Sequence, residues 1–250
     1  MKEPTGFTLI TGASSGIGRA IAVRLSSEKN VILHGRDAGR LDETRSLCPG
    51  TGKRLIWQFD LAGSGTLESS LVNLLRSNDA VIETFIHSAG MLKLLPFRTM
   101  THAHMAEMMN VNFMSAAQII SVLIKKSHND KRLKNVVLIS STASKFGAKA
   151  FSIYSASKGA LDSLMRSLAV ELAPEIRINS ILPGGIKTQM TGQIFSDPNL
   201  AERMEKDYPL GLGKAEDVAN LVHFLVSDEA KWITGQQFII DGGRTINITA

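Results

Sequence analysis

Short apolar runs alternate along most of this 250-residue chain with segments whose apolar residues recur at helical spacing. Runs of strand character occupy residues 7–10, 31–34, 55–59, 84–86, 136–139, 176–181 and 237–240. Helical periodicity follows the first run and recurs over residues 67–75, 101–126, 151–173 and 215–227. This alternation predicts an α/β fold with a doubly wound parallel sheet of about seven strands and helices on both faces. No linker or repeat interrupts it, which predicts a single domain over residues 1–250.

The composition favours a cytoplasmic enzyme. Hydrophobic residues make up 44% of the chain and aromatic residues only 6%, so the core should be aliphatic. The net charge of +5 is spread along the chain, which argues against a nucleic-acid-binding protein. The single cysteine, Cys48, excludes an internal disulfide and is typical of a reducing compartment. No apolar run approaches the ~20 residues of a membrane span, and the N-terminus lacks a signal-peptide pattern.

A glycine-rich turn follows the first predicted strand, and a helix begins inside it. The turn is Thr11-Gly12-Ala13-Ser14-Ser15-Gly16-Ile17-Gly18. In this context glycines allow the backbone to approach a pyrophosphate, and the helix N-terminus offers free N–H groups. A Rossmann-type dinucleotide site is therefore predicted. The spacing is G-x-x-x-G-x-G rather than the commoner G-x-G-x-x-G, and a generic Gly/Ser-rich loop is the alternative.

The end of the second predicted strand suggests which dinucleotide binds. NAD enzymes of this architecture usually carry an acidic residue there, but this chain has Gly35 followed by Arg36. A guanidinium matches a ribose 2′-phosphate in charge and geometry, which predicts NADP(H) in preference to NAD(H). Asp37 could instead serve NAD, or Arg36 could be a solvated loop arginine. Asp60, after the third strand, could accept a hydrogen bond from an adenine amine.

Tyr154 and Lys158 are four residues apart in a predicted helix, so they share one face. A nearby ammonium favours the phenolate and should lower the tyrosine pKa from about 10, which suits general acid–base chemistry. The alternative is that both residues decorate an exposed helical turn.

Polar residues elsewhere could complete this site. Ser140 and Ser141 follow a continuous apolar strand at its carboxyl end, where open α/β sheets place their sites. Asn112 lies inside a predicted helix, where it is either a kink with a purpose or a tolerated polar residue. The polar segment at about 187–208 interrupts the alternation and is predicted to be a substrate lid.

Taken together, the motifs resemble the short-chain dehydrogenase/reductase family over essentially the whole chain. They are Thr11-Gly12-x-x-x-Gly16-x-Gly18, Asn112, Ser141, Tyr154-x-x-x-Lys158, Pro183-Gly184 and Ile240-Asp241-Gly242-Gly243. Ser141 lies thirteen residues before Tyr154, the usual spacing in the family, which favours it over Ser140 as the catalytic serine. One departure is that His87-Ser88-Ala89-Gly90 stands where relatives usually carry Asn-Asn-Ala-Gly, which leaves the hydrogen bonds of this loop undefined.

The resemblance implies hydride transfer between a nicotinamide dinucleotide and a carbonyl carbon, without a metal. Tyr154 would be the general acid in reduction, Lys158 would hold the nicotinamide ribose and lower the tyrosine pKa, and Ser141 would bind the substrate oxygen. Asn112 would hold a water that links Lys158 to solvent. The implied cofactor site consists of Gly12, Ser14, Ser15, Gly16, Ile17, Gly18, Arg36, Asp60, Leu61, Ala89, Gly90, Tyr154, Lys158, Pro183, Gly184, Ile186 and Thr188.

The substrate expected from the resemblance is a 3-oxoacyl thioester, as in the 3-oxoacyl-[acyl-carrier-protein] reductases. The alternatives are a dehydrogenase of a sugar, polyol or steroid-like alcohol, and a non-catalytic NADP(H)-binding regulatory protein. An acyl carrier protein is acidic, and could dock on a basic cluster formed by Lys125, Lys126, Lys131, Arg132 and Lys134. The second basic residue of carrier-protein reductases is missing, because Glu175 stands there and Arg177 lies in the next strand. Relatives are commonly dimers or tetramers, so a homo-oligomer is expected.

Overall fold

Seven parallel strands form one sheet in the structure, a computed structural model that describes residues 5–63, 65–192, 202 and 205–246. The order across the sheet is β3-β2-β1-β4-β5-β6-β7. The strands are β1 Thr5–Thr11, β2 Val31–Gly35, β3 Arg54–Gln58, β4 Ala80–His87, β5 Asn135–Ile139, β6 Arg177–Pro183 and β7 Gln237–Ile240. The predicted Rossmann-type doubly wound sheet is confirmed.

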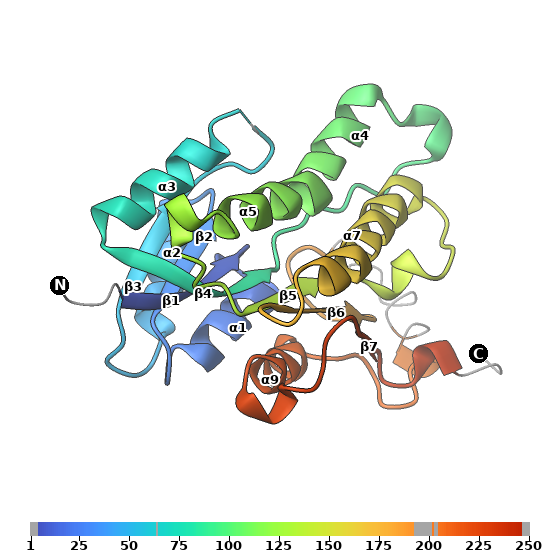
Figure 1. The fold of residues 1–250 in the computed structure, drawn as a ribbon. Coiled ribbons are helices and arrows are strands. Elements are labelled where there is room, and N and C mark those ends of the chain that lie inside the picture. The colour runs from blue at the N-terminus through green and yellow to red at the C-terminus, as the bar shows by residue number, and fades with distance from the viewer. Residues whose placement is uncertain (1–4, 64, 193–201, 203–204, 247–250) are drawn as a thin grey trace.

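Helices cover both faces of this sheet (Figure 1). One face packs against α1 (Gly16–Leu25), α2 (Ala38–Leu47) and α9 (Ala215–Leu225). The other packs against α3 (Leu67–Ser77), α5 (Ser115–Leu123) and α7 (Ser152–Glu171). Two shorter helices, α4 (His102–Met109) and α6 (Lys126–Asn129), flank α5 along the chain.

The strand pleat explains why there are two apolar cores. Successive residues of a strand point to opposite faces, so in β1 Leu9 joins one core and Ile10 the other. Phe85 and Ile86 of β4 divide in the same way. Because both faces are buried, these strands show continuous apolar runs instead of alternation with polar residues.

The helix predicted over residues 101–126 is interrupted in the structure. It ends as α4 at Met109, continues as a π-helical turn over Asn110–Met114, and resumes as α5. Asn112 lies in the π turn with its side chain fully buried. Single π turns often occur at functional sites. The kink considered at Asn112 therefore takes the form of a π turn.

The apolar pattern does not predict α2, because only Leu41 and Thr44 of its residues are buried. A cap starts this helix instead. The Asp37 carboxylate accepts a hydrogen bond of 3.1 Å from the backbone N–H of Arg40. Asp37 is therefore committed to helix initiation, which matters for the choice of cofactor discussed below.

The middle of the sheet contains the topological switch point. β1 and β4 are neighbours, and from them the chain proceeds to opposite edges of the sheet. Loops that leave in opposite directions open a crevice at the carboxyl ends of such strands. The loops after β1 and β4 border this crevice. In the described part of the chain, no helix combines the length and the apolar character needed to cross a membrane.

Candidate active site

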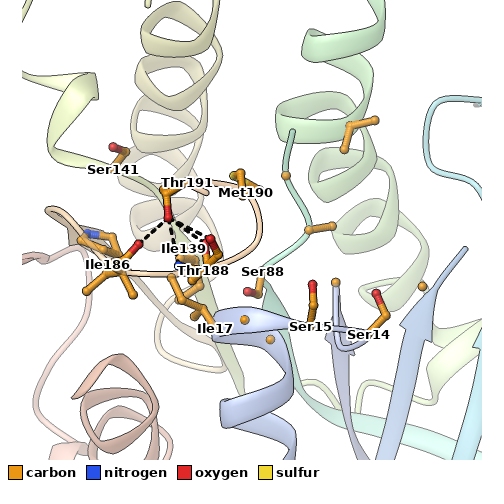
Figure 2. A pocket seen from close by; sticks show the side chains of 18 of the residues that line it. Ser14, Ser15, Ile17, Ser88, Ile139, Ser141, Ile186, Thr188, Met190 and Thr191 are labelled. Atoms are coloured by element: carbon orange, nitrogen blue, oxygen red, sulfur yellow. Dashed lines mark hydrogen bonds between the residues drawn. The ribbon is translucent and has the colours of Figure 1, made fainter. Parts of the chain in front are cut away.

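A cleft of about 300 Å³ opens at the carboxyl ends of the central strands (Figure 2). Every residue that the resemblance assigns to the cofactor lines this cleft, and so does Ser141. Of the predicted site residues, only Asn112 is absent from the lining. The fold therefore brings together residues from position 12 to position 188.

The glycine loop fits a pyrophosphate. Gly12 has φ +71° and Gly16 has φ +50°, a backbone region that favours glycine. A Cβ at Gly18 would lie 2.2 Å from the Gly12 carbonyl oxygen, so the start of α1 can approach the turn only without a side chain. The Ser15 side chain makes no capping hydrogen bond to α1. The first N–H groups of this helix, at the positive end of its dipole, thus remain available to an anion.

Two arginines line the cleft near the end of β2 and the start of α2. Arg36 after β2 lines the cleft, as predicted, and Arg40 on the first turn of α2 lies beside it. Asp37 does not line the cleft, because its carboxylate caps α2. Arg40 also donates a hydrogen bond to Gln189, which joins α2 to the segment after β6. Sequence reasoning missed Arg40 because the helix that carries it gave no apolar signal.

Tyr154 and Lys158 project from one face of α7 toward the cleft. The Lys158 Nζ lies 5.8 Å from the centre of the Tyr154 ring and donates a 2.9 Å hydrogen bond to the Ile139 carbonyl. Burial lowers the pKa of Lys158 to about 8, and the charge of Asp162 opposes this shift. Sequence analysis missed Asp162.

The expected lowering of the Tyr154 pKa is not what the chain alone shows. Although part of the ring is exposed, burial of the phenol raises its pKa, and a hydrogen bond with Ser141 acts in the opposite direction. Desolvation is the larger of these two effects, and the Lys158 Nζ donates its hydrogen bond to the Ile139 carbonyl. The phenol is therefore a protonated group in the chain alone, as a general acid requires.

The two candidate serines have different partners. The Ser140 hydroxyl is buried and donates a 3.3 Å hydrogen bond to the Lys158 carbonyl. The Ser141 hydroxyl accepts a 3.1 Å hydrogen bond from the N–H of Ala143, and it lies at the start of a 3₁₀ turn over Thr142–Ser144. Since the bond with Tyr154 is also made by Ser141, the geometry agrees with the preference for Ser141 over Ser140.

Asn112 lies behind the cleft and connects three segments. Its Oδ1 accepts a 2.7 Å hydrogen bond from the N–H of Met91, and its Nδ2 donates to the Ser157 hydroxyl at 2.9 Å. Nδ2 also donates to the Met91 carbonyl at 3.1 Å. The side chain therefore joins the π turn to α7 and to the loop after β4, and the water-holding role implied by the resemblance stays a prediction.

His87, the departure from the usual Asn-Asn-Ala-Gly loop, is fully buried at the end of β4. Its Nδ1 lies 3.0 Å from the Thr11 hydroxyl, which itself accepts a hydrogen bond from the N–H of Ala89. Burial lowers the pKa of His87 to about 3, and the nearby charge of Lys158 adds to this effect. A neutral ring therefore joins β1 to β4 beside the cleft.

The segment after β6 borders the cleft, and its Thr188 side chain lies beside the glycine loop, 3.2 Å from where a Cβ on Gly16 would be. Figure 2 shows the Thr191 hydroxyl at the centre of a hydrogen-bonded turn. This hydroxyl donates to the Ile186 carbonyl at 2.7 Å and accepts from the N–H of Thr188 at 2.9 Å. The lid predicted at about 187–208 continues into residues 193–201 and 203–204, which lie outside the described residues.

The basic cluster considered for a carrier protein lies before β5, whereas Ser141 follows that strand. Acidic residues pair with two of its members. The Lys125 Nζ lies 2.7 Å from Oε1 of Glu68, and the Arg132 Nη2 lies 2.6 Å from Oε1 of Glu83. Arg177 donates hydrogen bonds to the carbonyls of Ile233 and Leu225 and so serves the packing of α9. These contacts weaken the case for a docking surface.

Within the described ranges, no three His, Cys, Asp or Glu side chains are grouped so that they could hold a metal ion. The polar groups of the cleft are hydroxyls, amide N–H groups, cations and the single carboxylate of Asp60. This set suits an anionic dinucleotide and a carbonyl or hydroxyl substrate.

Comparisons with known proteins show what the whole chain is similar to. The profile of a family described as Enoyl-(Acyl carrier protein) reductase matches residues 12–245. The chain is 30% identical over 242 residues to the D-erythrulose reductase of Gallus gallus, covering 96% of this chain and 95% of that protein. It is 31% identical over 238 residues to the L-xylulose reductase of Bos taurus, with 94% of each covered. The solved structure described as Short-chain dehydrogenase/reductase SDR:Glucose/ribitol dehydrogenase from Brucella melitensis is 29% identical, with a TM-score of 0.86 and 97% of each chain covered.

Proposed function

We propose that this chain, which belongs to the short-chain dehydrogenase/reductase family, is an NADP(H)-dependent reductase of small sugar-like carbonyl compounds. Family membership makes it an NAD(P)-dependent oxidoreductase that acts on CH–OH groups. The substrate class rests on the relatives, which are reductases of erythrulose and xylulose. This corrects the order of the sequence expectations, since the sugar or polyol alternative is now better supported than the 3-oxoacyl thioester.

The cofactor supplies the hydride, and the chain's own residues handle the proton. In reduction, Tyr154 donates its phenolic proton to the carbonyl oxygen, while the Ser141 hydroxyl donates a hydrogen bond to the same oxygen. The Lys158 ammonium stabilises the tyrosinate that this transfer leaves. The observation that carries the proposal is the convergence of these three side chains in one cleft with the glycine loop.

A reductase of carrier-borne 3-oxoacyl thioesters is the second candidate, because the description of the matching family profile names an acyl carrier protein. The exposed side chains of Lys126, Lys131 and Lys134 would have to bind the carrier without Lys125 and Arg132, because these two already form ion pairs with acidic residues.

We also propose a homodimer or homotetramer, which sedimentation equilibrium would identify.

A substrate panel distinguishes the two candidates. Consumption of NADPH should be fastest with short ketoses such as erythrulose and xylulose, and slow with an acetoacetyl group on pantetheine or on an acyl carrier protein. A preference for the carrier-borne substrate that is lost at high salt and in Lys131→Glu/Lys134→Glu would establish the second candidate instead. If the carbonyl compounds of both classes fail to oxidise NADPH, both substrate assignments are wrong.

NADPH should bind about ten- to a hundredfold more tightly than NADH. A charge-assisted pair between Arg36 and a 2′-phosphate contributes roughly 1.5–3 kcal/mol, and Arg40, which lines the same cleft, offers a second guanidinium. Fluorescence titrations of both cofactors with wild type, Arg36→Ala and Arg40→Ala would measure the preference. Arg45→Ala is the matched control, because Arg45 is on α2 but pairs with Asp42 away from the cleft. Equal affinity for the two cofactors in the wild type would exclude this role.

A further inference from the structure

Tyr154, Lys158 and Asp162 form one line along α7. They are four residues apart, so they lie above one another on the same face of the helix. Lys158 and Asp162 are almost completely buried, with 4% and 3% of their surface exposed. The ammonium lies 5.8 Å from the centre of the Tyr154 ring, and the negative charge of Asp162 acts on it from the next helical turn.

Asp162 also contacts the turn that follows Ser141. The Ser144 hydroxyl donates a 2.6 Å hydrogen bond to Oδ2 of Asp162. Ser144 is the last residue of the 3₁₀ turn that the Ser141 hydroxyl caps. One carboxylate oxygen thus joins α7 to the turn that carries the candidate catalytic serine.

The other carboxylate oxygen of Asp162 indicates a second role, an electrostatic one. Oδ1 of Asp162 is buried and has no hydrogen-bond partner among the described residues. A carboxylate in such a place is costly unless an opposite charge compensates it. Lys158, one helical turn away, is the cation that acts on it electrostatically.

The surroundings of Lys158 offer few other titratable groups. α7 packs against β5, β6, α4, the π turn and the 3₁₀ turn. Among the described residues, the titratable groups that interact with Lys158 are Tyr154 and Asp162 on α7 and His87 at the end of β4. His87 is buried in its neutral form, so Asp162 supplies the negative charge.

We propose that Asp162 is a positioning residue for the reaction, which keeps the Lys158 ammonium charged and, through Ser144, holds the Ser141 turn against the Tyr154–Lys158 face. A charged lysine in turn stabilises the tyrosinate formed during reduction. The catalytic part of this inference rests on the proposed function, whereas the charge pairing does not.

Two variants separate the negative charge of Asp162 from its hydrogen bond with Ser144. Asp162→Asn keeps an acceptor for Ser144 and removes the charge, while Ser144→Ala removes the hydrogen bond and keeps the charge. Losing a negative charge beside the Tyr154–Lys158 pair lowers the proton affinity of the pair as a whole. The alkaline limb of kcat for reduction should therefore move to lower pH by about one unit in Asp162→Asn. Ser144→Ala should lower kcat while leaving the limb in place. An unmoved limb in Asp162→Asn, or an equal movement in Ser144→Ala, would overturn the proposal.

A thermal-unfolding cycle tests the pairing without any substrate. Lys158→Met leaves the Asp162 carboxylate buried and uncompensated, so Tm should fall, and adding Asp162→Asn should raise it again. In the wild-type background, the same Asp162→Asn change should lower Tm. If Asp162→Asn has the same effect in both backgrounds, or if Lys158→Met and the double variant both fail to fold, the pairing is absent. A failed substrate panel with a positive cycle would refute the proposed function alone.

Discussion

Tyr154→Phe is expected to lower kcat for carbonyl reduction by about 10²–10⁴-fold, the usual contribution of a general acid. The change removes one hydroxyl and keeps the ring, which contacts Phe151 edge-on at 5.9 Å between ring centres. Tm and NADPH affinity should therefore stay close to wild type. Steady-state rates, thermal unfolding and cofactor titration would be measured on the same preparation.

The only other tyrosine provides a matched control. The Tyr208 hydroxyl accepts a 2.8 Å hydrogen bond from the N–H of Gly185, so Tyr208→Phe removes the same atom outside the cleft lining. This control should keep most of the activity. It also leaves Tyr154 as the single tyrosine, so ultraviolet absorbance in alkali would report its pKa, expected above the usual value in the chain alone. A Tyr154→Phe enzyme with a near wild-type rate would remove this residue from the mechanism.

Acidification below pH 6.5 should steadily destabilise the fold. Burial lowers the pKa of His34 to about 4 and that of His87 to about 3. Between these values and 6.5 the unfolded chain binds protons that the folded chain does not, so stability is complete above pH 6.5 and falls with pH. Each histidine should lower the free energy of unfolding by about 1.4 kcal/mol per pH unit below 6.5. For the two histidines together, the loss should reach about 5 kcal/mol by pH 4.5. That is a large fraction of the ~5–15 kcal/mol typical of a folded protein.

Urea unfolding at several pH values would measure this loss. Trp57 is a suitable fluorescent probe, because its ring lies 4.7 Å from that of His34. His87→Asn removes one titrating group and should roughly halve the slope of stability against pH. A free energy of unfolding that stays constant between pH 6.5 and 4.5 would contradict the prediction.

Local chemistry explains how much of the fold and site the sequence predicts. The glycine loop is recognisable because Gly12, Gly16 and Gly18 are needed wherever the backbone bends or approaches closely. Continuous apolar runs predict the strands because both faces of the sheet are buried. The four-residue spacing of Tyr154 and Lys158 places them on one face in any helix.

What the sequence does not predict depends on burial or on contacts between distant segments. Asp162 resembles a surface carboxylate until Ser144 and Lys158 are brought against it. The lowered pKa predicted for Tyr154 is wrong in direction, because desolvation cannot be deduced from the spacing of residues alone. Arg40 reaches the cleft through α2, whose start depends on one cap and not on an apolar pattern.

The cap at the start of α2 also limits where a carboxylate that binds the ribose hydroxyls of NADH could be introduced. Asp37 cannot be recruited to bind ribose hydroxyls without giving up its hydrogen bond to the Arg40 N–H. Gly35 is crowded, since a Cβ there would lie 3.2 Å from the Leu41 side chain and 3.3 Å from that of Ser14. Position 36 is exposed and already borders the cleft, so an engineer would place the new carboxylate there, as Arg36→Asp, and neutralise its neighbour with Arg40→Leu.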